Sequence, residues 1–235
     1  MRIGQQSRSA SLVAALLLGL LLSSGCKPPA ESYFRSAREK YYNADYEGAI
    51  ADCTEAIRLK PNYAEAYNNR GLARQSEGDY EGAIADFTEA IRLKPNYAEA
   101  CKNRSLGRGA TGDYDGAIAD CTEAIRLEPD FAEAYYNRGH ARQSKGDHDG
   151  AIADYTEVIR LKPDEAGAYY NRGIARRSEG DHEGAIADFT EAIRLEPDFA
   201  EAYSGRAAAR EKVGDHLGAI SDSNQVVRIN SQVDR

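Results

Sequence analysis

Apolar and polar residues follow a helical period in two neighbouring segments of the chain, residues 64–77 and 80–93. In both segments apolar residues recur three or four positions apart, which is the spacing of one face of an α-helix. Gly78 interrupts the pattern, and Asp79 is suited to cap the second helix because its carboxylate can accept a bond from a free backbone N–H. Pro95 then prevents that helix from continuing. The pattern predicts two helices joined by a tight turn.

This two-helix pattern repeats along the chain with a period of 34 residues. The prolines that end the second helices recur at this interval: Pro61, Pro95, Pro129, Pro163 and Pro197. Gly-Asp pairs recur at the same interval, beginning at Gly78, Gly112, Gly146, Gly180 and Gly214, and the first unit has Ala44-Asp45 instead. Without an insertion or deletion the chain divides into six units: 30–63, 64–97, 98–131, 132–165, 166–199 and 200–233. A fixed period of this length predicts a repeat architecture.

The period, with small and aromatic positions such as Gly71 and Tyr67, resembles the tetratricopeptide repeat. The resemblance implies an all-α fold, a right-handed superhelical solenoid of six helix-turn-helix units that forms one domain at residues 30–235. It also implies an inner groove, lined by the first helix of each unit, in which members of the family bind peptides. Ser105 and Ala207 depart from the family pattern, because they replace the glycine at the tight contact between helices with another small residue.

An arginine stands at position 7 of five units, where the family usually has leucine: Arg70, Arg104, Arg138, Arg172 and Arg206. Every unit also has an aspartate in its second helix: Asp52, Asp86, Asp120, Asp154, Asp188 and Asp222. If Gly71 faces Ala83 in an antiparallel hairpin, Arg70 lies within reach of Asp86. We therefore expect bidentate ion pairs, with ligand-binding hooks as the alternative. Gly82 and its equivalents early in the second helices have no explanation here, since glycine inside a helix costs up to about 1 kcal/mol relative to alanine.

The first helices carry an asparagine at the same place in four consecutive units: Asn69, Asn103, Asn137 and Asn171. A side-chain amide can donate to a carbonyl and accept from an N–H, so a row of them would hold an extended peptide regardless of its sequence. The alternative is that asparagine is common at this place and bonds locally. The neighbouring groove positions vary and would set specificity; they are Leu72, Lys102, Leu106, Tyr136, His140, Tyr170 and Ile174.

The residues before the repeats have a different composition. An apolar run from Leu12 to Leu22 follows a basic start; it is shorter than the roughly 20 residues that cross a bilayer as a helix, and it is typical of a secretory signal. The segment that ends at Cys26 resembles a bacterial lipoprotein box, with serine where leucine is usual. The resemblance implies a signal at residues 1–25, a lipidated Cys26 with a tether at 26–29, and an exported protein anchored to an envelope membrane and facing the periplasm. An ordinary cleaved signal, with secretion, is the alternative.

The remaining chemistry of the sequence excludes several classes of function. A formal net charge of −8 argues against a nucleic-acid partner, which favours a basic surface. The recurring histidines stand one per repeat, too far apart to share an ion: His148, His182 and His216. The sequence shows no metal-ligand spacing, phosphate loop or catalytic triad, so we predict no enzyme, no metal and no cofactor. Cys101 and Cys121 should face each other in one hairpin. We expect them to be core residues, with a disulfide between them as the alternative.

These observations predict a non-enzymatic protein-interaction scaffold, tethered to the bacterial envelope, that binds an extended peptide or a partner protein in its groove. The alternative is a self-associating structural or assembly factor, for example for an outer-membrane complex, a secretion system or a pilus. The last unit bears on this choice. Ser221 and Ser223 replace apolar residues there. These serines are typical of the polar cap that a repeat array usually needs. The alternative is that this end docks on a second copy or on a partner.

Overall fold

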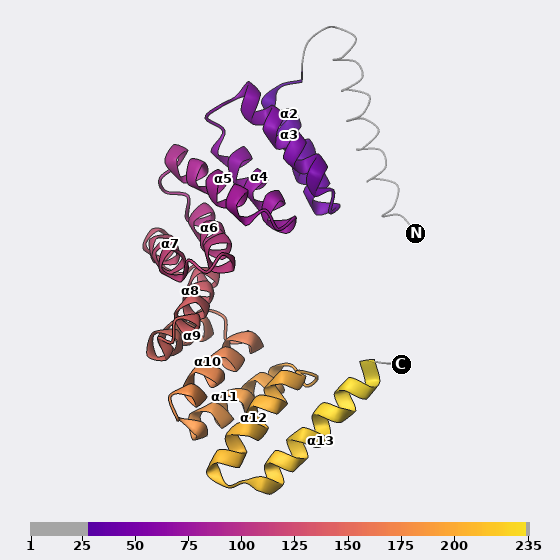
Figure 1. Cartoon of the computed structure of the whole chain (residues 1–235), viewed down its shortest axis with the longest axis vertical. Helices are drawn as coiled ribbons and strands as arrows, with labels where there is room; N and C mark the ends of the chain where they lie inside the picture. The colour runs from indigo at the N-terminus through magenta and orange to yellow at the C-terminus, as the bar shows by residue number, and fades with distance from the viewer. Residues whose placement is uncertain (1–27, 234–235) are drawn as a thin grey trace. The chain divides into compact units, whose positions relative to one another are not determined.

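A computed structural model describes residues 28–233, which form α-helices joined by short turns (Figure 1). The predicted leader and Cys26 lie outside these residues. The described residues form two compact sections, 28–95 and 96–233. The described helices of the N-terminal section are α2 (Ala30–Tyr42), α3 (Tyr46–Leu59), α4 (Ala64–Ser76) and α5 (Tyr80–Leu93). Those of the C-terminal section are α6 (Ala98–Ala110), α7 (Tyr114–Leu127), α8 (Ala132–Ser144), α9 (His148–Leu161), α10 (Ala166–Ser178), α11 (His182–Leu195), α12 (Ala200–Val213) and α13 (His216–Val233).

Each predicted unit is a pair of packed helices, and we number the units repeats 1 to 6 in chain order. In repeat 2, α4 ends one residue before the predicted end, and the turn passes through Gly78 at a φ of +83°. Glycine suits this left-handed conformation because it has no Cβ. The capping residue Asp79 then starts α5, which ends before Pro95, as predicted. In residues 28–233 no helix is both long and apolar enough to cross a membrane.

The glycine near the start of each second helix makes room for the capping aspartate. The N–H of Gly82 donates to Oδ1 of Asp79 at 2.9 Å, and the other repeats have the equivalent bond. A Cβ at Gly82 would lie 2.1 Å from Oδ2 of the same carboxylate. The aspartate therefore fills the space that a side chain would need, which explains a residue that helix propensity disfavours.

The tight contact between paired helices involves an aromatic ring that the sequence interpretation did not name. A Cβ at Gly71 would lie 2.7 Å from the ring of Phe87, so this glycine packs against Phe87. In repeat 5 the ring of Phe189 also reaches the following repeat, where a Cβ at Gly205 would lie 2.7 Å from it. The large core residue of the second helix thus needs small residues on the first helices around it.

Candidate functional site

Buried aspartates of the second helices bind the arginines at position 7 of the repeats. Arg70 donates from Nε and Nη2 to Oδ2 and Oδ1 of Asp86, at 2.9 and 2.7 Å. This is the bidentate geometry that makes an ion pair both strong and directional. The same pairing recurs as Arg104–Asp120, Arg138–Asp154, Arg172–Asp188 and Arg206–Asp222. The predicted structural ion pairs are confirmed, and they occupy the arginines that we had considered as ligand hooks.

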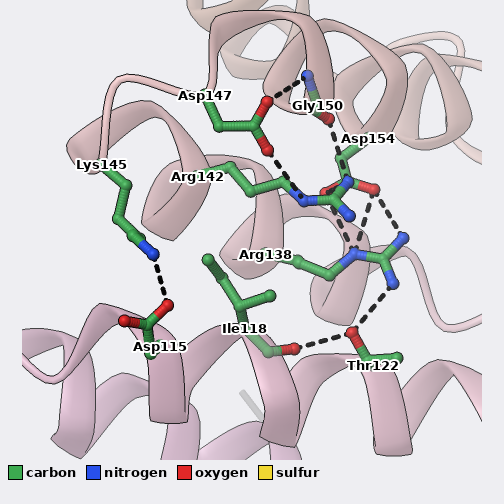
Figure 2. A network of polar contacts seen from close by, with 9 residues as sticks. All are labelled: Asp115, Ile118, Thr122, Arg138, Arg142, Lys145, Asp147, Gly150 and Asp154. Carbon is green, nitrogen blue, oxygen red and sulfur yellow. Dashed lines mark hydrogen bonds and ion pairs between the residues drawn. The ribbon is translucent and has the colours of Figure 1, made fainter.

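A second arginine completes each of these carboxylate sites, and the sequence interpretation missed it. In repeat 4, Nη1 of Arg142 donates to Oδ2 of Asp154 at 2.9 Å and to the carbonyl of Gly150 at 3.2 Å (Figure 2). Its Nε lies 3.6 Å from Oδ2 of the capping residue Asp147. Arg142 follows Arg138 by four residues and therefore lies on the same helix face. This spacing recurs every 34 residues and is the signal that would have identified it.

The arginine at position 7 also links consecutive repeats. Nη1 of Arg138 donates to Oγ1 of Thr122 in repeat 3 at 3.2 Å, and that hydroxyl donates to the carbonyl of Ile118 at 2.8 Å (Figure 2). Burial opposes the charge of Arg138, but the hydrogen bonds and the negative charge of Asp154 more than offset it, so the pKa of Arg138 lies above its ordinary value. The charges of this network neutralise one another, and its role is structural.

The four asparagines of the predicted row differ in their burial and in their hydrogen bonds. Nδ2 of Asn171 donates to the hydroxyl of Tyr136 at 2.7 Å, so this residue bonds to the preceding repeat. Asn103 is only 1% exposed, which leaves it little access to a ligand. Asn69 and Asn137 are half-buried, and Asn137 lines a hollow. The local-bonding interpretation therefore describes Asn171, and contact with a peptide stays a prediction for Asn69 and Asn137.

Two hollows open beside the first helices of the C-terminal section. The smaller, which we call the α8 hollow, has a volume of about 190 Å³ and is lined by Ala132, Glu133, Tyr136, Asn137, Val158, Lys162 and Glu165. The larger, the α12 hollow, has a volume of about 380 Å³ and is lined by Tyr170, Ile174, Arg177, Ala200, Glu201, Ser204, Gly205, Val226 and Asn230. Four predicted groove residues thus line hollows: Tyr136, Asn137, Tyr170 and Ile174.

The α8 hollow combines an aromatic wall with a fixed pair of opposite charges. The ring of Tyr136 packs edge-on against Tyr155, with the ring centroids 5.7 Å apart. Burial raises the pKa of the Tyr136 hydroxyl, and its bond with Asn171 lowers it in part. Lys162 forms an ion pair with Glu133, whose hydrogen bond holds the pKa of that carboxyl below its ordinary value. The hollow therefore offers an apolar surface beside groups that can bond to a peptide backbone.

The α12 hollow has an aromatic wall and a guanidinium. The ring of Tyr170 packs against Phe189, with the centroids 5.8 Å apart, which fixes its orientation. The sequence interpretation missed Arg177 and Asn230 as lining residues. Arg177 stands where repeat 4 has Gln143, and this departure from the repeat is the signal that would have found it. Asn230 belongs to the part of α13 that extends beyond the usual length of a second helix.

The other predicted groove residues line neither hollow. Leu106 and His140 are exposed, and the Lys102 ammonium lies 6.0 Å from the centroid of the Phe131 ring, within the range of a cation–π contact. Leu72 is half-buried in the N-terminal section. Contact of these four side chains with a partner stays a prediction.

The cysteines are core residues in the structure. Cys101 and Cys121 are free thiols, so the disulfide that we considered is not formed. Burial raises the pKa of each thiol to about 11, with Ser105 opposing the shift at Cys121 through a hydrogen bond. Burial raises the pKa of Cys53 to about 12. Within residues 28–233, no group of three or more His, Cys, Asp and Glu side chains is arranged to hold a metal ion.

Paired helices recurring every 34 residues, with a buried ion pair in each of repeats 2 to 6, define an α-helical repeat protein. Models of the tetratricopeptide repeat match residues 64–97, 136–198 and 170–233, and a further TPR repeat model matches residues 37–76 and 110–146. The chain belongs to the tetratricopeptide-repeat family. The predicted all-α helical repeat fold is confirmed.

Several solved structures resemble the chain. The crystal structure of MamA has 26% sequence identity and a TM-score of 0.67, covering 70% of this chain and 96% of that chain. MamA 41-end from Desulfovibrio magneticus RS-1 has 22% identity and a TM-score of 0.70, covering 73% and 97%. YrrB, described as a TPR protein with an unusual peptide-binding site, has 23% identity and a TM-score of 0.64, covering 74% and 89%. The last two show likeness of fold alone. Comparison with curated protein sequences finds no match.

Proposed function

We propose that this chain is a non-enzymatic protein-interaction scaffold, and that it binds an extended peptide segment of a partner on the first-helix face of its C-terminal section. One observation carries the proposal: both hollows form at groove positions, with Tyr136 and Asn137 in the α8 hollow and Tyr170 and Ile174 in the α12 hollow. Membership of the tetratricopeptide-repeat family supports a binding function. The peptide-binding site named for YrrB supports a peptide as the ligand.

Each hollow combines apolar side chains with charged groups of both signs, and these groups set its preference for side chains. The α8 hollow already contains the paired charges of Glu133 and Lys162, so it suits an apolar side chain next to a backbone amide that bonds to Asn137. In the α12 hollow, the guanidinium of Arg177 lies beside the apolar side chains of Tyr170 and Ile174. Because the carboxylate of Glu201 lines the same hollow as Arg177, this hollow suits an apolar residue next to a group that both donates and accepts hydrogen bonds.

Site-specific photocrosslinking in the native envelope tests this proposal. A photoreactive residue at Ser204, an exposed position that lines the α12 hollow, should capture a partner. The same residue at Ala187, an exposed position on the second helix α11, serves as the control and should capture far less. Equal capture at both positions, or capture at Ala187 alone, would place the binding surface elsewhere.

We further propose that the scaffold is an exported lipoprotein of a bacterial envelope, anchored by a lipid on Cys26. The support is the apolar run from Leu12 to Leu22 and the cysteine that follows it. Metabolic labelling with a fatty acid should label the wild-type chain and leave Cys26→Ser unlabelled, with the variant moving from the membrane fraction to the soluble fraction. Cys101→Ser is the control and should stay labelled. Absence of label from the wild type would refute lipidation, and a secreted protein would then be the better interpretation.

A further inference from the structure

The last repeat exposes an apolar stripe. On α13, Leu217 is 83% exposed, Ile220 57% and Val227 68%. The opposite face of α13 packs against α12 and buries Ala219 and Ile229 (Figure 1). At the position of Leu217 every earlier repeat has a carboxylate: Glu47, Glu81, Asp115, Asp149 and Glu183. A polar cap would have kept that charge, so the stripe is not a simple end of the array.

The stripe follows the spacing of a helix that pairs with another helix. Leu217, Ile220, Asn224 and Val227 are separated by three, four and three residues, which is the a, d, a, d order of a heptad repeat. All four side chains are exposed on the outer face of α13. A single polar residue at an a position fixes the register of helices that pair in this way, and two copies of α13 in register would place Asn224 against its own counterpart. The pattern therefore favours a second copy of the same helix over an unrelated partner.

The equivalent face of α11 is already an interface between helices. Ile186 packs in one apolar cluster with Ala209 of α12, and Thr190 accepts a hydrogen bond from Arg206 of α12 at 3.1 Å. Ile220 and Asn224 occupy these two places in repeat 6. The outer face of α13 thus continues a surface that binds a helix in the preceding repeat.

The first helix of repeat 1, α2, does not have the residues that would pack against this face. α2 has the exposed residue Glu39 where repeat 6 has Ala209, and it has Ser36 in place of the arginine. The hydroxyl of Ser36 is used within its own repeat, donating to Asp52 at 2.6 Å. Stacking α2 of a second copy on α13 would bury the Glu39 carboxylate against Ile220, which is costly for an unpaired charge. Head-to-tail association is therefore disfavoured.

We propose that α13 pairs in parallel with α13 of a second copy, so that the chain forms a symmetric dimer through its last repeat. Each apolar residue of the stripe then meets its counterpart, and the two Asn224 amides hydrogen-bond to each other. Two chains with a formal net charge of −8 each repel, but the positions beside the stripe carry no carboxylate; they are His216, Ser221, Ser223, Arg228 and Asn230. This inference goes beyond peptide binding and does not depend on it.

Sedimentation velocity of the purified full chain over a wide range of concentrations tests the dimer. We expect a concentration-dependent dimer for the wild type and its loss in Leu217→Glu, a change that restores the acid of the other repeats at an exposed site. Tyr42→Glu changes a residue of α2 that is also highly exposed and should leave the dimer intact. Helical circular dichroism verifies that each variant is folded. A wild type that is monomeric at all concentrations, or a dimer that survives Leu217→Glu and is lost in Tyr42→Glu, would overturn the proposal.

Disulfide trapping tests the parallel arrangement. In a Cys26→Ser background, Leu217→Cys should crosslink to itself under mild oxidation, because the like residues face each other. The buried thiols whose pKa is raised stay unreactive in the folded chain. A crosslink that forms only when the Leu217→Cys chain is mixed with the Val227→Cys chain would show an antiparallel pair and overturn the parallel arrangement.

Discussion

The buried aspartates are the most constrained side chains of the repeats. Asp154 accepts hydrogen bonds from Arg138 and Arg142 and is almost completely buried. If the carboxylate is removed, Arg138 loses its carboxylate partner and Arg142 keeps only the longer contact with Asp147 at 3.6 Å. Breaking a buried ion pair from one side typically costs about 3–5 kcal/mol. We therefore predict that Asp154→Ala lowers the free energy of unfolding by an amount of this order, seen as a lower midpoint in chemical denaturation. The denaturation midpoint is the measured quantity, since a repeat array need not unfold in one step.

The matched control is Glu157→Ala in the same helix. Glu157 pairs with Arg160 on the surface of α9, and both side chains are more than a third exposed. Solvent screens such a pair, so its loss should cost no more than about 1 kcal/mol. If the two variants were equally stable, the carboxylate network would not stabilise the hairpin.

The glycine beside the capping aspartate gives a second prediction. Gly150→Ala should destabilise the chain, although alanine favours helices, because the new Cβ would lie 2.2 Å from Oδ2 of Asp147 and displace the cap. Gly109→Ala is the control: its Cβ meets nothing within 4 Å, so it should stabilise α6 by about 0.4–1 kcal/mol. Thermal unfolding of both variants checks this. A rise in the unfolding temperature for both would mean that the carboxylate is not held against Gly150.

The buried thiols predict a dependence of stability on alkaline pH. Burial raises the pKa of Cys53 from an ordinary value of 9.0 to about 12 in the folded chain. The unfolded chain therefore loses this proton at lower pH than the folded chain does. The contribution of Cys53 to stability is present below about pH 9 and is lost as the pH rises towards the folded pKa. We expect the unfolding temperature of the wild type to fall more steeply above pH 9 than that of Cys53→Ala; equal slopes would contradict the burial.

At the scale of helices, the positions of the helices were predictable from neighbouring residues in the sequence. The roles of Arg142 and Gly82 depend on contacts between helices and side chains that the sequence pattern does not show. The bounds of α5 were predictable because Asp79 and Pro95 act on the backbone next to them, and the end of α4 differed by one residue, within the usual variation of helix ends. The first arginine of each carboxylate site followed from the register of the hairpin. The second was missed because in a helical pattern Arg142 looks like any exposed charge. Gly82 was unexplained because its cause is the position of a neighbouring side chain.

The candidate site was predictable only in part, for a related reason. The sequence identifies which residues lie on the first-helix face, and Tyr136 and Tyr170 are among those that line the hollows. Whether an asparagine on that face is open to a ligand depends on its neighbour in the preceding repeat, as the bond between Asn171 and Tyr136 shows. That contact depends on how consecutive hairpins pack, which no single helix encodes.

At the scale of the whole molecule, the C-terminal section has two candidate binding surfaces. The first-helix face holds the hollows proposed for a peptide, and the outer face of α13 holds the stripe proposed for a second copy. The two surfaces share helix α13, on which Asn230 both lines the α12 hollow and lies beside the stripe. A dimer of the scaffold would present two peptide sites together, and linking sites in this way raises the avidity for a multivalent partner.

The central claim, that a partner binds at the hollows, is tested most directly by crosslinking capture from the native cells. The wild type is compared with a double variant, Asn137→Ala with Arg177→Ala, and with Glu191→Ala, which changes a residue of α11 outside both hollows. The account predicts a partner that the wild type and Glu191→Ala capture and that the folded double variant loses. A partner captured equally by all three chains would contradict the account.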